Sequence, residues 1–565
     1  MATKKKPAGA AIYYHPDGFD TSRPKLMGRH VAGESFLAGL ARHAAPGPLV
    51  AFAKGRQPFE DFQARVAKAD PARETDLISF GEPERLGEIG CLFAPQPPEA
   101  RLAWARRRIG QRTFSLCGVC HTTASGTVMQ SFTDLLTAPL QSWDAVICPS
   151  QSVRTTVERI VDDYDDYLAQ RVGRRVKVRP QLPLIPLGID CAAFTPDEPA
   201  QARGQALRQQ LDIPAEALVF LFMGRLAFHG KAHPLPLYLA LETAAQELDR
   251  EVVLLLAGWA ANDFIAVQFR DGARSFCPSV RTILLDGRVP EVRRDIWHAA
   301  DIFTSPAESI QETFGLTPLE AMAAGLPCVL SDWNGYRETL RHEEEGFLVP
   351  TWAAPPGSGE ELAQRYLLEE ETYDTYIGKA GQLAAVEVAP MAEAFKALGA
   401  NPDLCRRMGK AGQARVRQLY DWSVIIPQYE ALWGELAVRR AKDKESAPLK
   451  SGRPAVPPAP DPFTLFAHYP THALTAKTRV VLALAGQQER IKTLLGFKMN
   501  TLAGELMPAV ETSQAMLGRL AEEGGASAAE LIDLAPPVER HAAERAIVWL
   551  AKLGIVRLEN TDTGP

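Results

Sequence analysis

The stretch ESIQETFGLTPLEAMAAGLP, residues 308–327, separates the apolar runs DIFTSP and CVLSD. Pro318 suits an early helical position, while Gly325 and Pro327 suit the end of a helix. Apolar runs on either side of a helix are typical of buried parallel strands. These residues therefore predict a strand–helix–strand unit of an α/β fold.

The same alternation continues in both directions along the chain. Strand-like runs such as AAIYY, GPLVAFA and WDAVICPS come early, and LVFLFMGRL, EVVLLLAG and VRTILLDGRV follow later, with helical stretches between them. Two successive α/β domains are therefore predicted, over residues 1–205 and 206–419. A charged, proline-rich linker over 439–462 and a mainly helical segment over 463–565 complete the predicted division.

Composition excludes several classes of protein. The chain has 565 residues and a net charge of −6, so it is long enough for about three domains and shows no global sign of nucleic-acid binding. The basic start MATKKK is not followed by an apolar run of about seven residues, and no stretch approaches the roughly 18 apolar residues of a spanning helix. We therefore expect a cytoplasmic protein with eight reduced cysteines.

The stretch LCGVCHT, residues 116–122, contains the C-x-x-C-H spacing of covalent haem attachment. Without an export signal, and inside a short apolar run with a polar exit, Cys117 and Cys120 are better interpreted as buried residues of a strand. His121, at the end of that strand, stays open as a candidate.

Ligands of open parallel sheets bind beyond the carboxyl ends of the strands, so charged residues there are the best site candidates. Arg225 and Lys231 follow LVFLFMG. The helix start at Phe314, Gly315 and Leu316 would direct free N–H groups to the same edge, which favours an anion. Together, the two cations and this helix start predict a binding site for a diphosphate. Three glutamates follow DIFTSP on the neighbouring segment: Glu308, Glu312 and Glu320.

The order of these motifs resembles family 4 of the retaining glycosyltransferases, which have the two-Rossmann GT-B fold. The resemblance rests on GRL with a following lysine and on Glu312 and Glu320 in an E-x7-E arrangement before EAMAAGLPCV. It also rests on IPLGIDCAAF, SDWNGYRETL, EGFLVP and NPDLCRRMGKAGQARVRQLYDW, and it covers residues 10–437. It implies an N-terminal acceptor domain completed by a returning helix over 420–438, and a C-terminal nucleotide-sugar domain.

The resemblance also implies roles for single residues. Arg225 and Lys231 would neutralise the diphosphate, and Glu312 would contact hydroxyls of the transferred sugar. Glu320 would accept hydrogen bonds from the ribose, and His121 would face the sugar from the other domain.

Backbone N–H groups of Phe314, Gly315 and Leu316 would complete the donor site. Met27 and Gly28 would form the first loop, in which a single Gly28 replaces the family's paired glycines.

Each of these residues has a structural alternative. Glu320 could form a capping box with Thr317, and Glu312 could cap the helix start. Arg225 could be a surface ion-pair residue, Lys231 a solvated loop residue and His121 a satisfied core residue. Gly28 could serve only a turn.

A competing metal interpretation rests on Asp163 and Asp165, which spell D-x-D within DDYDDY. Neighbouring apolar residues recur at helical spacing, which favours a helix with both carboxylates on its solvated face. These residues are Ile160, Tyr164, Tyr167, Leu168 and Val172. Because Arg225 and Lys231 supply positive charge, neither a metal nor another cofactor is expected.

The resemblance implies hexosyl transfer from a nucleotide-diphosphate sugar to an acceptor hydroxyl with retention of configuration. The leaving phosphate would help to deprotonate the acceptor, so no side-chain base is assigned. The sugar, the nucleotide and the acceptor, whether carbohydrate, lipid or protein, stay undetermined.

The C-terminal segment reads helix, break, helix and then a strand-like GIVRL, which resembles a winged-helix module. One alternative is therefore a DNA-binding regulator with a degenerate transferase domain. Residues 463–565 hold ten Lys and Arg against eleven Asp and Glu, which favours protein contact over DNA.

A basic cluster in RLAWARRRIGQR offers a further alternative, peripheral contact with a membrane surface. A solvated helix face explains the same cluster and is favoured. Its members are Arg101, Arg106, Arg107, Arg108 and Arg112.

Overall fold

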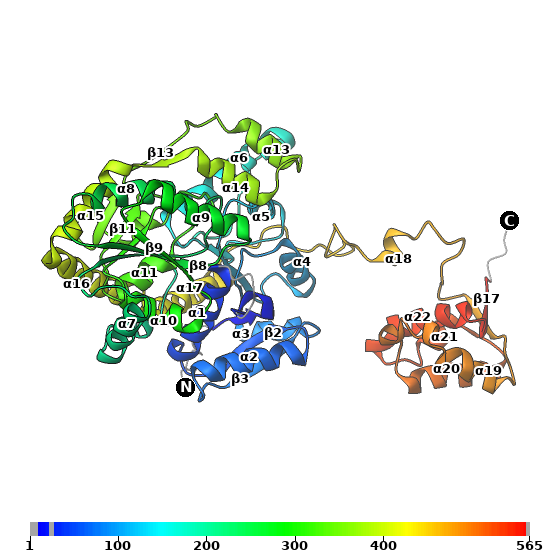
Figure 1. Ribbon diagram of the computed structural model, residues 1–565. Helices are drawn as coiled ribbons and strands as arrows, with labels where there is room; N and C mark the ends of the chain where they lie inside the picture. Colours follow the sequence, from blue (N-terminus) through cyan, green and yellow to red (C-terminus); the bar gives the residue numbers. More distant parts are fainter. Residues whose placement is uncertain (1–8, 22–27, 561–565) are drawn as a thin grey trace, which may run out of the picture. The chain divides into compact units, whose positions relative to one another are not determined.

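The computed structural model describes residues 9–21 and 28–560, and the chain forms two compact units, Met1–Val456 and Pro457–Pro565. The first unit contains two α/β domains, each built on a six-stranded sheet, and the second is a small helical unit with a three-stranded sheet (Figure 1).

The first domain has the parallel strand order β3-β2-β1-β4-β5-β6. A chain that starts in the middle of the sheet and winds to both sides in this order is Rossmann-like. Its strands are β1 (Ala11–Tyr13), β2 (Leu49–Ala53), β3 (Thr75–Ser79), β4 (Cys91–Ala94), β5 (Ser115–Val119) and β6 (Ala145–Ile147). Its helices are α1 (Gly28–His43), α2 (Arg56–Ala69), α3 (Leu86–Ile89), α4 (Ala100–Ile109), α5 (Gly126–Thr137) and α6 (Gln151–Val172).

The second domain repeats this winding in the order β12-β11-β10-β7-β8-β9. Its strands are β7 (Leu218–Met223), β8 (Val252–Gly258), β9 (Arg281–Asp286), β10 (Ile302–Ser305), β11 (Cys328–Ser331) and β12 (Gly346–Val349). Its main helices are α7 (Glu198–Gln210), α8 (Leu235–Ala245), α9 (Asp263–Phe276), α10 (Pro290–Asp295), α11 (Leu316–Ala323), α12 (Tyr336–Thr339), α15 (Val388–Ala400) and α16 (Pro402–Leu419). Every residue of β7 and β8 is buried, which explains their uninterrupted apolar sequence.

The predicted fold class is confirmed. Two Rossmann-like domains follow one another as in the GT-B architecture, and β10, α11 and β11 form the strand–helix–strand unit predicted from residues 308–327. The helical C-terminal region is also present.

An insertion separates β12 from α15 in the second domain. It consists of β13 (Thr351–Ala353), α13 (Glu360–Leu367), α14 (Tyr373–Gln382) and β14 (Ala384–Val386), with the two strands paired antiparallel. Helices α13 and α14 lie beside α5 of the first domain (Figure 1).

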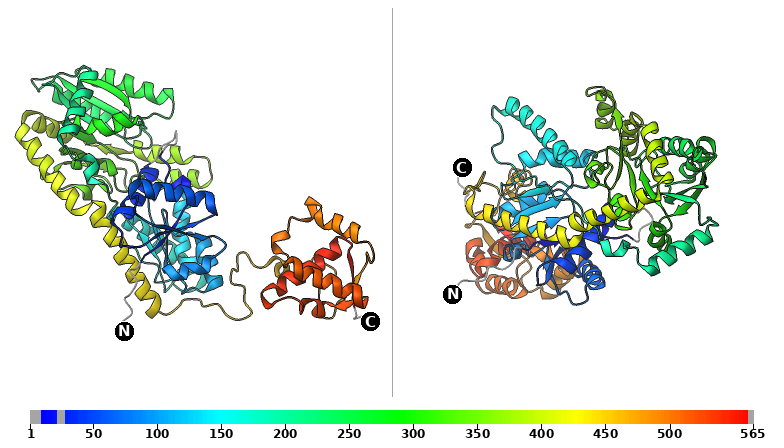
Figure 2. Two further views of the ribbon diagram at one scale, coloured as in Figure 1. Left: turned by 90° about the horizontal axis from the view of Figure 1, so that it is seen from below. Right: turned by 90° about the vertical axis from the view of Figure 1, so that its left-hand side faces the viewer.

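Helix α17 (Trp422–Lys442) returns the chain to the first domain, where it packs against α1 and β5. Figure 2 shows α16 and α17 following one another along both α/β domains. The side chain of Trp422 fills the space beside Gly39 and Gly188, where added Cβ atoms would lie 2.5 Å and 2.6 Å from its ring.

Part of the predicted linker over 439–462 is ordered against the first domain. Residues 439–442 end α17, and the next residues supply carbonyl groups to donors of α4 and the loop after it. Gln111 donates to the Ser446 carbonyl at 3.2 Å, and Arg107 donates to the Ala455 carbonyl at 2.7 Å. The boundary between the two units therefore falls after Val456.

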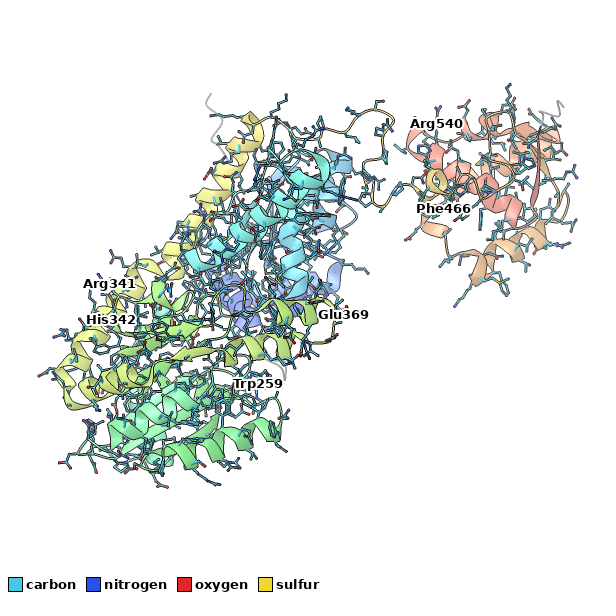
Figure 3. The ribbon with its side chains drawn as sticks, turned by 90° about the horizontal axis from the view of Figure 1, so that it is seen from above. Trp259, Arg341, His342, Glu369, Phe466 and Arg540 are labelled. Carbon is cyan, nitrogen blue, oxygen red and sulfur yellow. The ribbon has the colours of Figure 1, made fainter. Side chains whose placement is uncertain are left out.

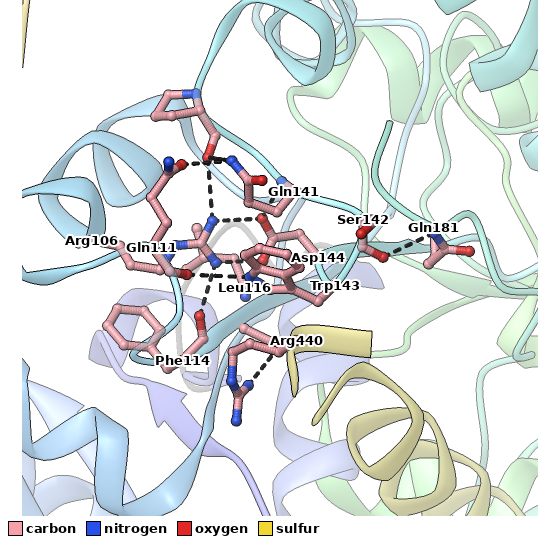
Figure 4. A network of polar contacts seen from close by, with 12 residues as sticks. Arg106, Gln111, Phe114, Leu116, Gln141, Ser142, Trp143, Asp144, Gln181 and Arg440 are labelled. Carbon is pink, nitrogen blue, oxygen red and sulfur yellow. Dashed lines mark hydrogen bonds and ion pairs between the residues drawn. The ribbon is translucent and has the colours of Figure 1, made fainter. Parts of the chain in front are cut away.

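The basic cluster of residues 101–112 forms the favoured solvated face only in part, because Arg101 and Arg108 of α4 are exposed whereas Arg106 is not. Arg106 is fully buried and binds both carboxylate oxygens of Asp144, at 2.5 Å and 2.7 Å, as well as the Phe114 carbonyl (Figure 4). Arg107 and Arg112 donate to carbonyls between residues 440 and 455. Fewer arginines of the cluster are therefore available to a membrane surface than the sequence suggested. In the described ranges no helix is long and apolar enough to cross a bilayer.

Asp163 and Asp165 lie on α6, as predicted, but only Asp163 faces solvent. Asp165 is buried because Val161 and Leu168, one turn away on either side, face the protein. Its carboxylate accepts the Val176 N–H at 2.8 Å and pairs with a guanidinium of the following segment. The expected solvated face is therefore wrong for Asp165, which is buried. The expected apolar face is wrong for Tyr167 and Val172, which are exposed.

The second unit has its own hydrophobic core, to which Met516, Leu531 and Ile547 contribute. Its sheet has the antiparallel order β16-β15-β17, and GIVRL contributes β17. The elements are α18 (Pro462–Leu465), β15 (Arg479–Leu482), α19 (Gln488–Gly496), α20 (Val510–Glu523), β16 (Ala526–Ser527), α21 (Ala528–Ile532), α22 (Arg540–Lys552) and β17 (Val556–Glu559). The winged-helix interpretation of this unit stays a prediction.

Candidate active site

The predicted site residues of the second domain gather where β7 and β10 end. These strands are neighbours in the parallel sheet, so the loops after Met223 and Ser305 leave the same edge. The first loop carries Arg225 and Lys231, and the second carries Glu308 and Glu312 before α11 begins.

Lys231 and Glu312 form an ion pair in this edge, with Nζ and Oε2 2.6 Å apart. Burial alone would lower the pKa of Lys231, but Glu312 and Tyr336 together raise it above its ordinary value. Burial would likewise raise the pKa of Glu312, but Lys231 and the backbone N–H groups of Phe314 and Thr313 hold it below its ordinary value. Both groups are therefore charged at neutral pH.

Tyr336 completes the support of Lys231. Its hydroxyl lies 3.1 Å from Nζ and 3.0 Å from the Ser305 hydroxyl, and Nζ lies 5.5 Å from the centre of its ring. The ring also explains why residue 315 is a glycine: an added Cβ would lie 2.2 Å from the ring, and the φ of +97° favours glycine as well. No role was predicted for Tyr336, and its position in SDWNGYRETL was the only available signal.

Arg225 is held by its own loop. Its guanidinium donates to the Gly230 carbonyl at 3.3 Å. Gln311 donates its amide N–H to the same carbonyl and accepts a hydrogen bond from Tyr373 at 3.1 Å. Gln311 and Tyr373 were not predicted, because no sequence pattern connects residues 62 positions apart.

Glu308 is nearly fully buried beside the same loop. One carboxylate oxygen accepts the His233 N–H at 2.7 Å, while Oε2 has no hydrogen-bond partner among the described residues. Burial is the main cause that raises the pKa of Glu308 to about 8. At neutral pH this carboxyl therefore holds a proton.

Helix α11 begins at Leu316, with Gly315 as the residue before it. Thr317 therefore lies inside the helix, so the capping box proposed for Glu320 does not form. Burial raises the pKa of Glu320. The Phe314 side chain is buried against Tyr420, with ring centres 5.8 Å apart, which leaves only its backbone for the site.

Glu312 does not cap α11, which has no side-chain cap, but it engages backbone N–H groups just before the helix. Its Oε1 accepts the Thr313 N–H at 3.3 Å, and its pKa responds to the Phe314 N–H. The N–H groups expected to be free at this helix start are thus partly engaged by Glu312 in the ligand-free protein.

The first domain brings His121 to this edge. His121 lies two residues after β5, and its carbonyl accepts a hydrogen bond from the Thr313 hydroxyl at 3.2 Å. Burial, and then the charge of Arg29, lower the pKa of His121 to about 4, so the imidazole is neutral at neutral pH. Gly28 begins α1 immediately before Arg29, and Met27 lies outside the described residues.

The sequence also singled out two other groups of residues. Cys117 and Cys120 are buried in and just after β5, as predicted for strand residues. Asp163 and Asp165 lie on α6, and the described residues include no cluster of three or more His, Cys, Asp or Glu suited to a metal ion.

The chain has recognisable sequence relatives, and one family match falls within the second domain. Residues 217–366 match the family model described as Glycosyl transferases group 1. D-inositol 3-phosphate glycosyltransferase of Xylanimonas cellulosilytica is 32% identical over 168 residues, which are 29% of this chain and 38% of the relative. Alpha-maltose-1-phosphate synthase of Mycolicibacterium smegmatis is 28% identical over 308 residues, 51% of this chain and 68% of the relative.

This chain therefore covers well under half of the first relative and about two thirds of the second. Among solved structures, Anabaena HepE in complex with UDP and glucose is 16% identical with a TM-score of 0.48, covering 76% of this chain and all of that chain. The family match at residues 217–366 includes Arg225, Lys231 and both glutamates of the E-x7-E arrangement.

Proposed function

We propose that the protein is a retaining, metal-independent glycosyltransferase of the family 4 type. It would move a hexosyl group from a nucleotide-diphosphate sugar to an acceptor hydroxyl. The observation that carries the proposal is the Lys231–Glu312 pair beside Arg225, at the carboxyl edge of the parallel sheet and at the start of α11.

In this proposal the two cations stabilise the departing diphosphate. Lys231 is fixed by Glu312 and Tyr336, and Arg225 by the Gly230 carbonyl, so little reorganisation is needed as negative charge develops. Because Lys231 is already paired, the diphosphate must share or replace its contact with Glu312. The released carboxylate oxygen then becomes available to a hydroxyl of the transferred sugar.

The remaining residues would orient the donor. His121 is neutral, so it serves as a hydrogen-bond partner of the sugar and not as a cation. Glu320 makes no capping box in α11 and is assigned to the ribose hydroxyls. Backbone groups of Gly315 and Leu316, and the Gly28 end of α1, would complete the donor site.

Retention requires that the acceptor oxygen attack the anomeric carbon on the face from which the diphosphate leaves. The bond from that carbon to the diphosphate oxygen breaks, and the new bond to the acceptor oxygen forms on the same face. The acceptor proton passes to an oxygen of the departing phosphate. The protein then contributes position and charge, without a side-chain base.

A thermal-shift screen against UDP-, GDP- and ADP-sugars tests the donor class. A donor at 100 times its Kd should add about 2.7 kcal/mol to the free energy of unfolding. Turnover with that donor should survive excess EDTA, and NMR should show the donor's anomeric configuration in the product. Loss of turnover on chelation with recovery by manganese, or an inverted product, would contradict the proposal.

We further propose that the second unit is a winged-helix-like module that contacts protein. The balance of ten basic and eleven acidic residues supports protein over DNA. A cytoplasmic location is supported by eight free cysteines, seven of them buried.

A further inference from the structure

The insertion between β12 and α15 contacts the first domain through tyrosines. Glu369, labelled in Figure 3, lies in the turn between α13 and α14. Tyr366 of α13 stacks on Tyr376 of α14, with ring centres 4.3 Å apart and planes 10° apart. The Tyr366 hydroxyl accepts the Gly126 N–H at 2.9 Å, at the start of α5.

Tyr373 reaches the loop that carries His121. Its hydroxyl lies 3.5 Å from that of Thr122, the residue after His121. The insertion therefore touches the first domain at two points of one loop, residues 122–126.

The same tyrosine also reaches the loop that carries the two cations. Its hydroxyl donates to Gln311 at 3.1 Å, and Gln311 donates to the Gly230 carbonyl, which Arg225 also binds. Packing reinforces this connection, because a Cβ added to Gly378 of α14 would lie 2.9 Å from the His229 side chain. A chain of polar contacts thus runs from Thr122 through Tyr373 and Gln311 to the loop of residues 225–231.

We propose that Tyr373 and Gln311 are positioning residues that tie the cation loop of the second domain to the His121 loop of the first. The catalytic consequence rests on the proposed function: Arg225 and Lys231 reach their working positions only while the first domain is seated against the insertion. The Tyr373 hydroxyl is hydrogen-bonded to the cation loop through Gln311 and the Gly230 carbonyl, and the charge of Arg225 is near enough to counteract part of the rise that burial causes in the pKa of Tyr373.

A purely structural role for Tyr373 makes a different prediction. In that case the loss of its hydroxyl would loosen α14 alone and leave the two loops unchanged. The loops are therefore the places to measure.

Amide hydrogen exchange of the full chain without ligand measures both loops. Tyr373→Phe and Gln311→Met should each accelerate exchange about fivefold in peptides covering residues 122–126 and 225–231, because a half-buried hydrogen bond is lost. The double variant should exchange no faster than either single variant, because both changes break one chain of contacts. Tyr376→Phe is the matched control, since it removes a hydroxyl of α14 outside this chain, and it should leave both loops unchanged.

The proposal would be overturned if Tyr373→Phe left amide exchange unchanged in either of the two loops. It would also be overturned if the changes in exchange caused by the two single variants added up in the double variant. With the donor found by the thermal-shift screen, Tyr373→Phe should lower kcat about tenfold and change donor Kd less than twofold. An equal loss in donor affinity would also overturn it. If no nucleotide sugar is accepted, the proposed function fails, while the exchange experiment still decides the coupling of the two loops.

Discussion

Two ion pairs in the described part of the chain lie at opposite ends of parallel strands and differ in what surrounds them. Arg106 and Asp144 meet near the amino ends of β5 and β6, fully shielded from solvent. Lys231 and Glu312 meet at the carboxyl ends of β7 and β10, where each side chain keeps about 15% of its exposure. The two sheets wind in the same order. The two ion pairs therefore differ in the end of the strands at which they lie, and not in the fold around them.

Their surroundings differ as much as their positions. Asp144 accepts N–H groups from Leu116 and Gln141 in addition to Arg106, so its carboxylate is saturated by the chain itself (Figure 4). Lys231 and Glu312 are held firmly but remain within reach of solvent and of a ligand. A saturated pair can only stabilise the fold, whereas a pair at an open edge can exchange partners.

The largest effect is expected from the saturated pair. Asp144→Ala leaves Arg106 buried without a counter-charge and should lower the free energy of unfolding by about 3–5 kcal/mol. Urea unfolding measures the change. Asp163→Ala, which removes an exposed carboxylate, should change it by less than about 0.5 kcal/mol. If Asp144→Ala, like the control, lowered the free energy of unfolding by less than about 1 kcal/mol, the structural role assigned to the Arg106–Asp144 pair would be wrong.

The open pair should show the reverse pattern. Lys231→Ala should lower kcat by about 10²–10³, because charge on the departing diphosphate is poorly stabilised. Arg225→Ala should act in the same way. Steady-state kinetics with the identified donor measures the loss, with the exposed Lys410→Ala as control. Normal turnover in Lys231→Ala would remove this pair from the site.

The buried carboxyl of Glu308, at the same open edge as Lys231 and Glu312, should make the stability of the protein depend on pH. Its pKa of about 8 in the folded chain lies above its ordinary value of 4.5, so the folded state binds the proton more tightly than the unfolded state. This stabilisation is complete at low pH and is lost as pH rises toward and through 8. Glu308→Gln, which imitates the protonated acid, should therefore gain about 2 kcal/mol over wild type between pH 6 and pH 8. Denaturant unfolding at several pH values tests this, and a constant difference would contradict the protonated state.

Glu320 should affect binding and not stability. Because α11 begins before Thr317, Glu320→Ala removes no cap and should leave the unfolding midpoint nearly unchanged. Loss of its bond to the ribose should weaken donor affinity about tenfold, or roughly 1.4 kcal/mol. Isothermal titration measures this, and destabilisation with intact affinity would favour a structural role.

The smallest effect is expected from the second unit. A chain that ends after Val456 should keep donor affinity within about twofold, because the predicted donor residues all lie in the first unit. The full chain should show no salt-sensitive affinity for duplex DNA. Submicromolar DNA binding that disappears on truncation would restore the regulator hypothesis.

The sequence predicted the features that depend on local patterns. Apolar runs located β7, β10 and β11, and Pro318 and Gly325 bracketed the helix between them. Charged residues after strands pointed to Lys231 and Glu312, whose pairing the structure shows.

Features that depend on distant partners could not be predicted. Asp165 looked solvated within its helix, but its guanidinium partner comes from a later segment. Arg106 was counted with a basic surface, although Asp144, 38 residues away, draws it into the interior. Gln311 and Tyr373 meet only because an insertion folds back over the site.

The packing of Trp422 has a consequence for how the two α/β domains can move. Ile189, on the outgoing connection, exchanges backbone hydrogen bonds with Tyr420 and Trp422 on the returning one, at 2.9 Å and 3.1 Å. The two connections are therefore joined to each other directly, and the Trp422 ring packs so closely on Gly39 and Gly188 that a Cβ at either position would collide with it. A substitution at either glycine would therefore push Trp422 out of place and shift one connection against the other, without touching a residue of the proposed donor site.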